Sequence, residues 1–191
     1  MQKLFVVCVN GFPRSGKDTF VQSFMKEAPR DMLVRHVSTV DNAKAALQTL
    51  GWDRRGKTPE VREALDTLKQ MSNRLFNGSV EYIKHHVQDM KQQDYRIGVL
   101  FVDSREPEEL ELFNQLFGSI AVLVSRPNGE IKTLSNPADK NVLMYQYDHF
   151  VDNSGTLENL QQEAKTFLWR RIYNGSGPDN AYTTAVGIRR P

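Results

Sequence analysis

Cysteine is almost absent from this sequence, whose 191 residues include a single one, Cys8. A lone cysteine cannot form an internal disulfide, so nothing here calls for an oxidising compartment. Cys8 lies in the apolar run Leu4–Val9, where we predict a buried thiol. Long hydrophobic runs are missing too. That run is too short for the apolar part of a signal peptide, and no segment reaches membrane-spanning length, so we expect a cytoplasmic protein without a membrane partner.

An excess of charge of either sign is also missing. The 25 Lys and Arg residues are nearly balanced by 23 Asp and Glu residues, which leaves a net charge of +2. That value is too small to support a nucleic-acid partner, and no extended basic and aromatic surface is evident, which argues against a kinase of nucleic-acid ends. The hydrophobic fraction of 39% is that of an ordinary soluble domain with a sizeable core.

Short apolar runs alternate with longer stretches of helical periodicity along the chain. The runs that have the character of strands are Leu4–Val9, Leu33–Val37, Ile97–Val102, Ser119–Val124 and Tyr147–Val151. The first and third are almost continuously apolar, which is typical of parallel strands covered on both faces. The alternation predicts an α/β fold with an open, mostly parallel sheet and right-handed crossovers.

Two segments interrupt the alternation, and one follows it. Residues 41–94 contain helical patterns but no strand pattern, which predicts a helical insertion between the second and third strands. Residues 126–144 predict a lid-like loop, because they include turn-forming residues: Pro127, Asn128, Gly129, Asn136 and Pro137. We therefore expect one domain over residues 1–173, followed by a polar tail over residues 174–191.

The strongest functional signal is the segment Gly11–Thr19, directly after the first strand, which we call the phosphate loop. Gly11, Gly16 and Lys17 give the pattern G-x-x-x-x-G-K. The glycines let the backbone turn tightly and approach phosphate oxygens without a Cβ in the way. The amides of the loop and of the following helix N-terminus then point at the anion, and Lys17 can reach the β- and γ-phosphates.

One position departs from the usual pattern, because Asp18 stands where Ser or Thr normally follows the lysine. A carboxylate can also serve as a hard oxygen ligand, so we expect Asp18 to contact Mg²⁺ or its water shell and Thr19 to bond a phosphate oxygen. The loop residues that we expect to bind the nucleotide are Gly11, Arg14, Ser15, Gly16, Lys17, Asp18 and Thr19.

A second carboxylate, Asp103, ends the third apolar run and is followed closely by Arg105. The carboxyl ends of parallel strands form the ligand-binding edge of open sheets, so Asp103 can orient the water on Mg²⁺ or accept a proton from the substrate. The alternative role for Asp103 is a cap on the helix that begins near Pro107. Arg105 offers a planar fork to a substrate phosphate, unless it is simply a solvated surface residue.

Basic residues of the insertion and of the lid-like loop are the remaining candidates for binding and catalysis. Lys57 and Arg62 are candidates to bind the phosphate of an acceptor, and a solvated helix face is the alternative for both. Arg126 begins the lid-like loop, where it can lie against the nucleotide or clamp the transferring phosphoryl group.

With these residues the chain resembles the P-loop nucleoside monophosphate kinase superfamily, and it is most similar to the bacteriophage-type deoxynucleoside monophosphate kinases. Their phosphate loop also reads Gly-Lys-Asp-Thr. The other similar segments are Gly51-Trp52-Asp53, Asp103-x-Arg105-x-Pro107-x-Glu109 and Asp152-Asn153-Ser154-Gly155-Thr156-Leu157. The resemblance implies a three-layer P-loop NTPase fold with a five-stranded sheet, an acceptor-binding insertion and a short lid. It also implies that Asn153 lies near the adenine.

These observations predict a kinase that uses ATP and Mg²⁺ to phosphorylate a small phosphorylated acceptor, with a (deoxy)nucleoside monophosphate as the leading candidate. The proposed catalytic residues are Lys17, Asp103, Arg105 and Arg126. Animal-type phosphomevalonate kinases also carry Gly-Lys-Asp, and dephospho-coenzyme A kinases have a similar layout, so these acceptors remain open. A nucleotide-binding switch with no small acceptor is the alternative from another class.

Overall fold

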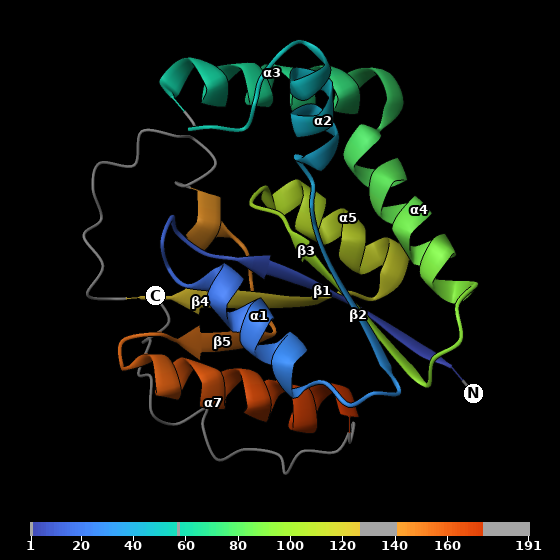
Figure 1. Ribbon diagram of the computed structural model, residues 1–191, viewed down its shortest axis with the longest axis vertical. Coiled ribbons are helices and arrows are strands. Elements are labelled where there is room, and N and C mark those ends of the chain that lie inside the picture. Colours follow the sequence, from blue (N-terminus) through green and yellow to red (C-terminus); the bar gives the residue numbers. More distant parts are fainter. Residues whose placement is uncertain (1, 57, 127–140, 174–191) are drawn as a thin grey trace.

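The computed structural model describes residues 2–56, 58–126 and 141–173. Strands and helices alternate along much of the chain, as predicted, with η1 a short 3₁₀ helix and η2 a π-helical turn (Figure 1). The elements are β1 (Lys3–Asn10), α1 (Lys17–Glu27), β2 (Met32–Ser38), α2 (Asp41–Thr49), α3 (Pro59–Phe76), α4 (Gly78–Lys91), β3 (Ile97–Asp103), α5 (Pro107–Phe117), β4 (Ile120–Ser125), η1 (Asn141–Met144), β5 (His149–Asp152), α7 (Leu157–Phe167) and η2 (Leu168–Tyr173).

The five strands form one sheet in the order β2-β3-β1-β4-β5, and every neighbouring pair is parallel. This arrangement confirms the predicted α/β class. Because all strands run the same way, their carboxyl ends meet at one edge of the sheet. Val9 is paired with Asp103 in the register of β1 and β3, so the third-strand carboxylate lies next to the start of the phosphate loop.

One face of the sheet packs against α1 and α7. Val7 and Val9 of β1 point to this side and are almost completely buried. Aromatic rings fill the space between the layers, with the rings of Phe24 and Phe101 4.8 Å apart at their centroids and that of Phe167 next to Phe24. Such packing at the centre of the sheet holds α1, and therefore the end of the phosphate loop, in a fixed position.

The other face packs against α4 and α5. Cys8, between the two valines of β1, points to this side with Met90 of α4 and Phe113 of α5. The thiol is fully buried, as predicted, and burial raises its pKa to about 12. It is therefore a protonated core residue at neutral pH, with no reactive role.

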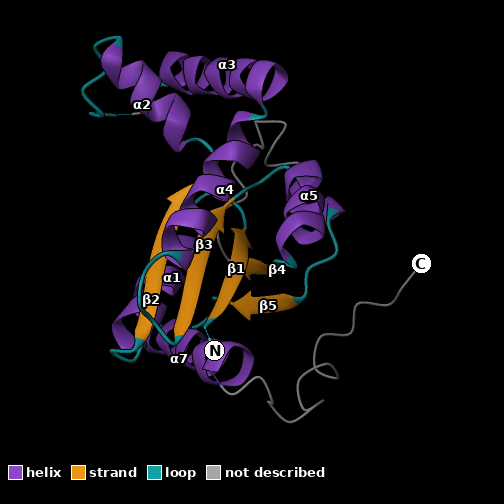
Figure 2. Ribbon diagram, turned by 90° about the vertical axis from the view of Figure 1, so that its right-hand side faces the viewer, coloured by secondary structure: helices purple, strands orange, loops and turns teal. Residues whose placement is uncertain are grey.

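The helices of the predicted insertion (residues 41–94) fall into two groups. Ile83, Val87 and Met90 of α4 are buried against the sheet, so α4 is the crossover helix that joins β2 to β3. By contrast, α2 and α3 lie beyond the carboxyl ends of β2 and β3 (Figure 2). They pack on each other and on the start of α4. The part of the insertion that overhangs the ligand-binding edge is thus formed by α2 and α3.

Two predicted segments lie wholly or largely outside the described residues. The polar tail over residues 174–191 is one of them, and residues 127–140 of the predicted lid are the other. The end of the lid segment is described, and there Val142 is buried within the one-turn helix η1. Among the described residues, no helix combines the length and the apolar character needed to cross a membrane.

Local signals explain where several helices begin. The hydroxyl of Thr156 accepts from the amide of Asn159, whose own side chain accepts from the amide of Thr156. This reciprocal arrangement is a capping box, which fixes the start of α7. Pro59 and Pro107 each occupy the first turn of a helix, α3 and α5, where the missing amide hydrogen costs nothing.

A histidine in the edge strand makes the stability of the fold depend on pH. Burial lowers the pKa of His149 to about 4, and the nearby charge of Arg171 adds to this effect. The ring packs against Phe167 and is neutral in the folded protein. The unfolded chain binds the proton at its ordinary pKa of about 6.5, so stability is lost as the pH falls from 6.5 towards 4.

We therefore expect His149→Phe to remove part of this pH dependence. Between pH 7 and pH 4.5 the wild type should lose roughly 2 kcal/mol more unfolding free energy than the variant. Urea denaturation of both proteins at the two pH values measures the difference. Equal losses in the two proteins would show that this imidazole titrates at its ordinary pKa.

Candidate functional site

The phosphate loop joins the centre of the sheet to α1 through an unusual backbone path. Gly11 and Gly16 have φ values of 148° and 99°, and Arg14 has a φ of 63°. Positive φ is rare for a residue with a side chain, so the Arg14 conformation costs energy that the rest of the loop must offset. The amide of Ser15 donates to the carbonyl of Phe12 at 3.1 Å, which closes the turn. The chain thus wraps into a tight loop, as the glycine pattern predicts.

Both glycines are also required by their surroundings. A Cβ on Gly11 would lie 2.3 Å from the carbonyl oxygen of Val124, and a Cβ on Gly16 would lie 2.4 Å from Nδ2 of Asn153. Neither space can hold a methyl group without movement of its neighbours. The loop backbone is therefore pressed against β4 on one side and against the segment after β5 on the other.

Gly11→Ala is accordingly expected to cost about 2–4 kcal/mol of unfolding free energy, since it combines positive φ with a clash against backbone. The matched control is Gly118→Ala, at a φ of 60° with nothing within 4 Å of the added Cβ, which isolates the conformational cost of about 1 kcal/mol. Urea denaturation of the two variants separates the cost of the clash at Gly11 from the conformational cost that both substitutions share. Similar losses in both would mean that the loop adjusts freely around Gly11.

Cationic and amide donors converge on the loop. Lys17 Nζ donates to the carbonyl oxygens of Gly11 and Phe12 at 2.7 and 2.9 Å, so its ammonium group lies across the loop. The first amides of α1 have no intrahelical acceptor, as at every helix N-terminus, and Gly16 provides no side-chain cap. Ser15 Oγ is buried and has no hydrogen-bond partner among the described residues. This set of donors, gathered on one tight loop, fits a polyphosphate.

A pocket of about 350 Å³ opens above the loop. Its walls come from three parts of the chain: loop residues 14–19, Arg126 after β4, and Asn153, Gly155, Leu157 and Leu160 around the start of α7. Every residue proposed from the sequence to bind nucleotide lines this pocket except Gly11. The structure therefore brings Arg126 and Asn153 to the phosphate loop from more than a hundred residues away.

Two asparagines hold the loop in place. Asn153 Nδ2 donates to the carbonyl of Ser15 at 2.9 Å. Asn10, which is fully buried at the end of β1, accepts from the amide of Gly11 and donates to the hydroxyl of Tyr147 at 2.8 Å. The same amide group lies 3.5 Å from the carbonyl oxygen of Arg105. Asn10 was not proposed from the sequence, although a polar residue that ends an apolar strand just before a loop glycine is a signal that could have identified it.

Two carboxylates and an imidazole meet beside the loop. Asp18, His36 and Asp103 each offer one ligand atom, and these atoms all lie within 4.8 Å of one another. His36 Nε2 is 3.1 Å from Asp103 Oδ1. Burial alone would lower the pKa of His36, but its contact with Asp103 and the charges of Asp103, Asp18 and Asp41 outweigh burial and raise the pKa. His36 was not proposed from the sequence.

The donor chemistry of this cluster fits a divalent cation. Carboxylate oxygens from Asp18 and Asp103 are the ligands that Mg²⁺ prefers, and Mg²⁺ commonly keeps several waters beside one or two carboxylates. Their position, at the end of β3 and in the first turn of α1, is next to the donors that fit a polyphosphate. His36 can orient the Asp103 carboxylate through their contact.

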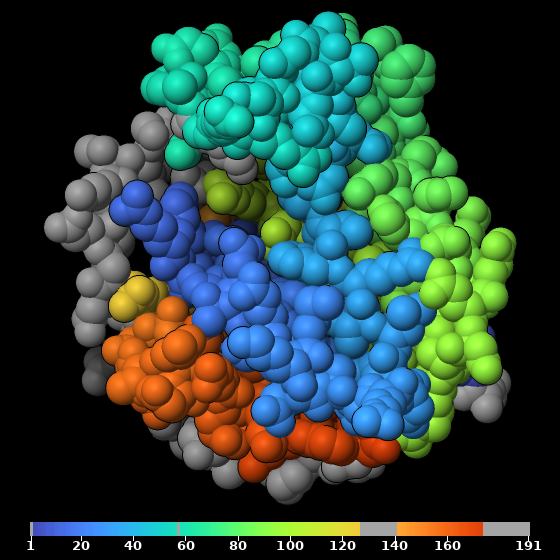
Figure 3. All heavy atoms as spheres, viewed as in Figure 1, coloured from blue at the N-terminus to red at the C-terminus, as the bar shows by residue number. Residues whose placement is uncertain are grey.

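Two of the residues proposed to bind an acceptor, Arg62 and Arg105, do not line the pocket above the phosphate loop. Arg105 is half-buried in the segment between β3 and α5, Arg62 is exposed near the start of α3, and Lys57 lies outside the described residues. On the face seen in Figure 3, the surface is hollowed between the blue phosphate-loop region and the teal α2–α3 region, with yellow-green atoms of the β3–α5 region at the bottom.

Comparison with known proteins finds matches among solved structures and none among sequences. No model of a protein family matches the sequence, and no curated protein sequence matches it. One of the matching solved structures is shikimate kinase from Aquifex aeolicus vf5, with 15% sequence identity and a TM-score of 0.40. The match covers 86% of this chain and 96% of that protein.

Proposed function

We propose that the chain is an ATP-dependent kinase that transfers the γ-phosphoryl group to a small phosphorylated acceptor, and that a (deoxy)nucleoside monophosphate is the leading candidate. One observation carries the proposal: the phosphate loop combines a tight turn through two glycines of positive φ, a lysine that lies across the turn and the N-terminus of α1, beside one pocket. That combination supports binding of a nucleotide polyphosphate.

The nucleotide would lie along the pocket, with its phosphates on residues 11–19. Lys17 would exchange its two carbonyl contacts for the β- and γ-phosphate oxygens, and Arg14 and Arg126 at the pocket wall would add positive charge. Asn153 would remain a structural support of the loop, because its side-chain amide already donates to Ser15.

Asp18 and Asp103 would hold Mg²⁺ directly or through its waters, and His36 would keep the Asp103 carboxylate in position. When bound there, the ion neutralises charge on the β- and γ-phosphates. The alternative role for Asp103 would be to accept a proton from the acceptor, at the sheet edge where the two substrates would meet.

The acceptor would occupy the hollow between the phosphate loop and α2–α3. Its phosphate would be held by Arg105 and Arg62, together with Lys57. An oxygen of that phosphate attacks the γ-phosphorus in line, the bond between the γ-phosphorus and its bridging oxygen breaks, and ADP leaves with the electron pair. The protein contributes positioning, positive charge and exclusion of water.

The experiment is a coupled assay of ADP release with Mg²⁺ and ATP across a panel of acceptors: deoxynucleoside monophosphates, ribonucleoside monophosphates, phosphomevalonate and dephospho-coenzyme A. Strong stimulation by one deoxynucleoside monophosphate is the expected result. Stimulation by phosphomevalonate or dephospho-coenzyme A would support the kinase activity and would show that the acceptor is not a nucleoside monophosphate. Slow hydrolysis that no acceptor stimulates would reject the kinase in favour of a nucleotide-dependent switch.

A further inference from the structure

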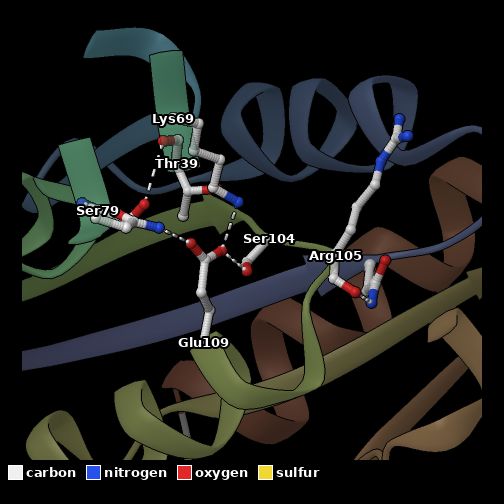
Figure 4. Close-up of polar contacts among 8 residues, drawn as sticks. Thr39, Lys69, Ser79, Ser104, Arg105 and Glu109 are labelled. Atoms are coloured by element: carbon white, nitrogen blue, oxygen red, sulfur yellow. Dashed lines mark hydrogen bonds and ion pairs between the residues drawn. The ribbon is translucent and has the colours of Figure 1, made fainter. Parts of the chain in front are cut away.

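A buried carboxylate, Glu109, connects the overhanging helix α3 to the segment that carries Asp103 and Arg105. It lies in the first turn of α5, and its side chain is only 10% exposed. Lys69 of α3 lies 3.0 Å from Glu109 Oε2, and Ser104 Oγ donates to the same oxygen at 2.7 Å. Asn73, one turn further along α3, donates to Oε1 at 3.3 Å. Figure 4 shows Lys69 and Ser104 converging on the carboxylate, while the side chain of Arg105 extends away from it.

Further hydrogen bonds return from α3 to the sheet and close a ring. Asn73 Oδ1 accepts from the amide of Ser79 at the start of α4, and Ser79 Oγ lies 3.5 Å from the carbonyl oxygen of Thr39. The amide of Thr39 in turn donates to the carbonyl of Asp103 at 3.1 Å. Asp103 precedes Ser104 in the chain, so the path ends where it began. We call this the polar ring; its members are Thr39, Lys69, Asn73, Ser79, Asp103, Ser104 and Glu109.

Burying the polar and charged groups of this ring costs free energy, so stability alone does not explain why they are there. Thr39, Ser79 and Ser104 are at most 5% exposed. A buried ion pair seldom improves stability over well-packed apolar residues, but it fixes one geometry because any other leaves a charge unpaired. Burial alone would raise the pKa of Glu109, but Lys69 and the bonds from Ser104 and Lys69 outweigh it and lower the pKa. The carboxylate is therefore charged at neutral pH.

Resting on the proposed function, we propose that Glu109 is a positioning residue that holds the acceptor-side helix α3 at a fixed place relative to Asp103 and Arg105. Through Ser104 it fixes the segment between those two residues, and through Lys69 and Asn73 it fixes α3. Glu109 touches neither substrate in this scheme.

The test uses Glu109→Gln, which keeps the size of the side chain and removes its charge. We expect the KM for the acceptor to rise about tenfold or more while the KM for ATP stays within about twofold, because only the acceptor side loses its fixed position. Glu109→Asp, which keeps the charge, should recover part of the effect. Combining Lys69→Met with Glu109→Gln should add little beyond the larger single effect, since both act on one contact.

The matched control is Glu81→Gln. Glu81 also pairs with a lysine, Lys84 at 2.8 Å, but the pair is exposed and lies within α4 alone. Its removal should leave both KM values within about twofold of wild type. If Glu109→Gln behaved like Glu81→Gln, or raised both KM values equally, the positioning role would be wrong.

Amide hydrogen exchange gives a readout that needs no activity. In Glu109→Gln, peptides from α3 should exchange about tenfold faster or more, while peptides from α1 keep their wild-type rates. If the wild type transferred phosphate to no acceptor, the proposed function would fail. The exchange rates of α3 in Glu109→Gln and wild type would still show whether Glu109 holds α3 in place. If Glu109→Gln did not fold, Lys69→Met and Ser104→Ala would replace it. Wild-type acceptor KM and wild-type α3 exchange in both would overturn the inference.

Discussion

Lys17→Ala is expected to lower the rate of phosphoryl transfer by about a thousandfold or more and to leave the fold intact, since it removes a preorganised charge from the reacting phosphates. In the structure the Lys17 ammonium lies across the loop, bonded to the carbonyl oxygens of Gly11 and Phe12. Alanine removes these two contacts and the positive charge. Single-turnover transfer at saturating ATP and acceptor measures the chemical step directly.

The matched control is Lys26→Ala, because Lys26 lies on the same helix, exposed in its last turn and away from the pocket. It should retain wild-type turnover and bind nucleotide as wild type does. Circular dichroism and urea denaturation of both variants would exclude unfolding as the cause of any loss. Wild-type turnover in Lys17→Ala would contradict the proposed kinase mechanism as a whole.

The fold could be predicted from the sequence because its central strands are buried on both faces. Continuous apolar runs such as Ile97–Val102 mark such strands almost directly, and β3 begins at the same residue and extends one further, to Asp103. The edge strand was placed less well. The run Tyr147–Val151 became β5 at His149–Asp152, with Tyr147 outside the strand and bonded to Asn10 instead. The apolar run does not show where the strand begins, because a buried tyrosine just before a strand continues the run in the same way as one within it.

In the helical insertion over residues 41–94, hydrophobic periodicity predicted the helices but not what each of them packs against. The apolar stripe of α4 packs on the sheet, while Met71, Leu75 and Phe76 of α3 are substantially exposed among the described residues. Both stripes look alike in sequence, since the pattern shows that a face is apolar but not what covers it. The division of residues 41–94 into a crossover helix and an overhanging pair therefore required three-dimensional information.

The residues of the candidate site also fall into those that could be predicted from the sequence and those that could not. The phosphate loop is contiguous, so its glycines and Lys17 could be identified from the sequence, and strand polarity placed Asp103 beside it. His36 was not proposed, and Glu109 was named only within a similar segment without a role, because their importance depends on partners far away in sequence, Asp103 and Lys69. A histidine near the end of a strand and a glutamate in the first turn of a helix are ordinary residues until those partners are known.

Asp103→Asn should reduce transfer by about a hundredfold and raise the Mg²⁺ concentration needed for half-maximal activity by about tenfold, because it removes one of two carboxylates from the proposed cation site. Asparagine keeps the shape of the side chain and an oxygen, so His36 and the backbone bond to Thr39 should remain in place. Titration of Mn²⁺ followed by electron paramagnetic resonance, with and without a non-hydrolysable ATP analogue, measures the cation independently of turnover.

Asp31→Asn is the control for this substitution, since Asp31 pairs with Arg96 at 2.6 Å on the surface, where both side chains are about half exposed. It should change neither the Mn²⁺ affinity nor the rate. A variant at position 103 with slow transfer but wild-type Mn²⁺ binding would assign Asp103 to proton acceptance from the acceptor rather than to the cation. Wild-type values for both quantities would remove Asp103 from the site, and with it the reason for the contact that His36 makes there.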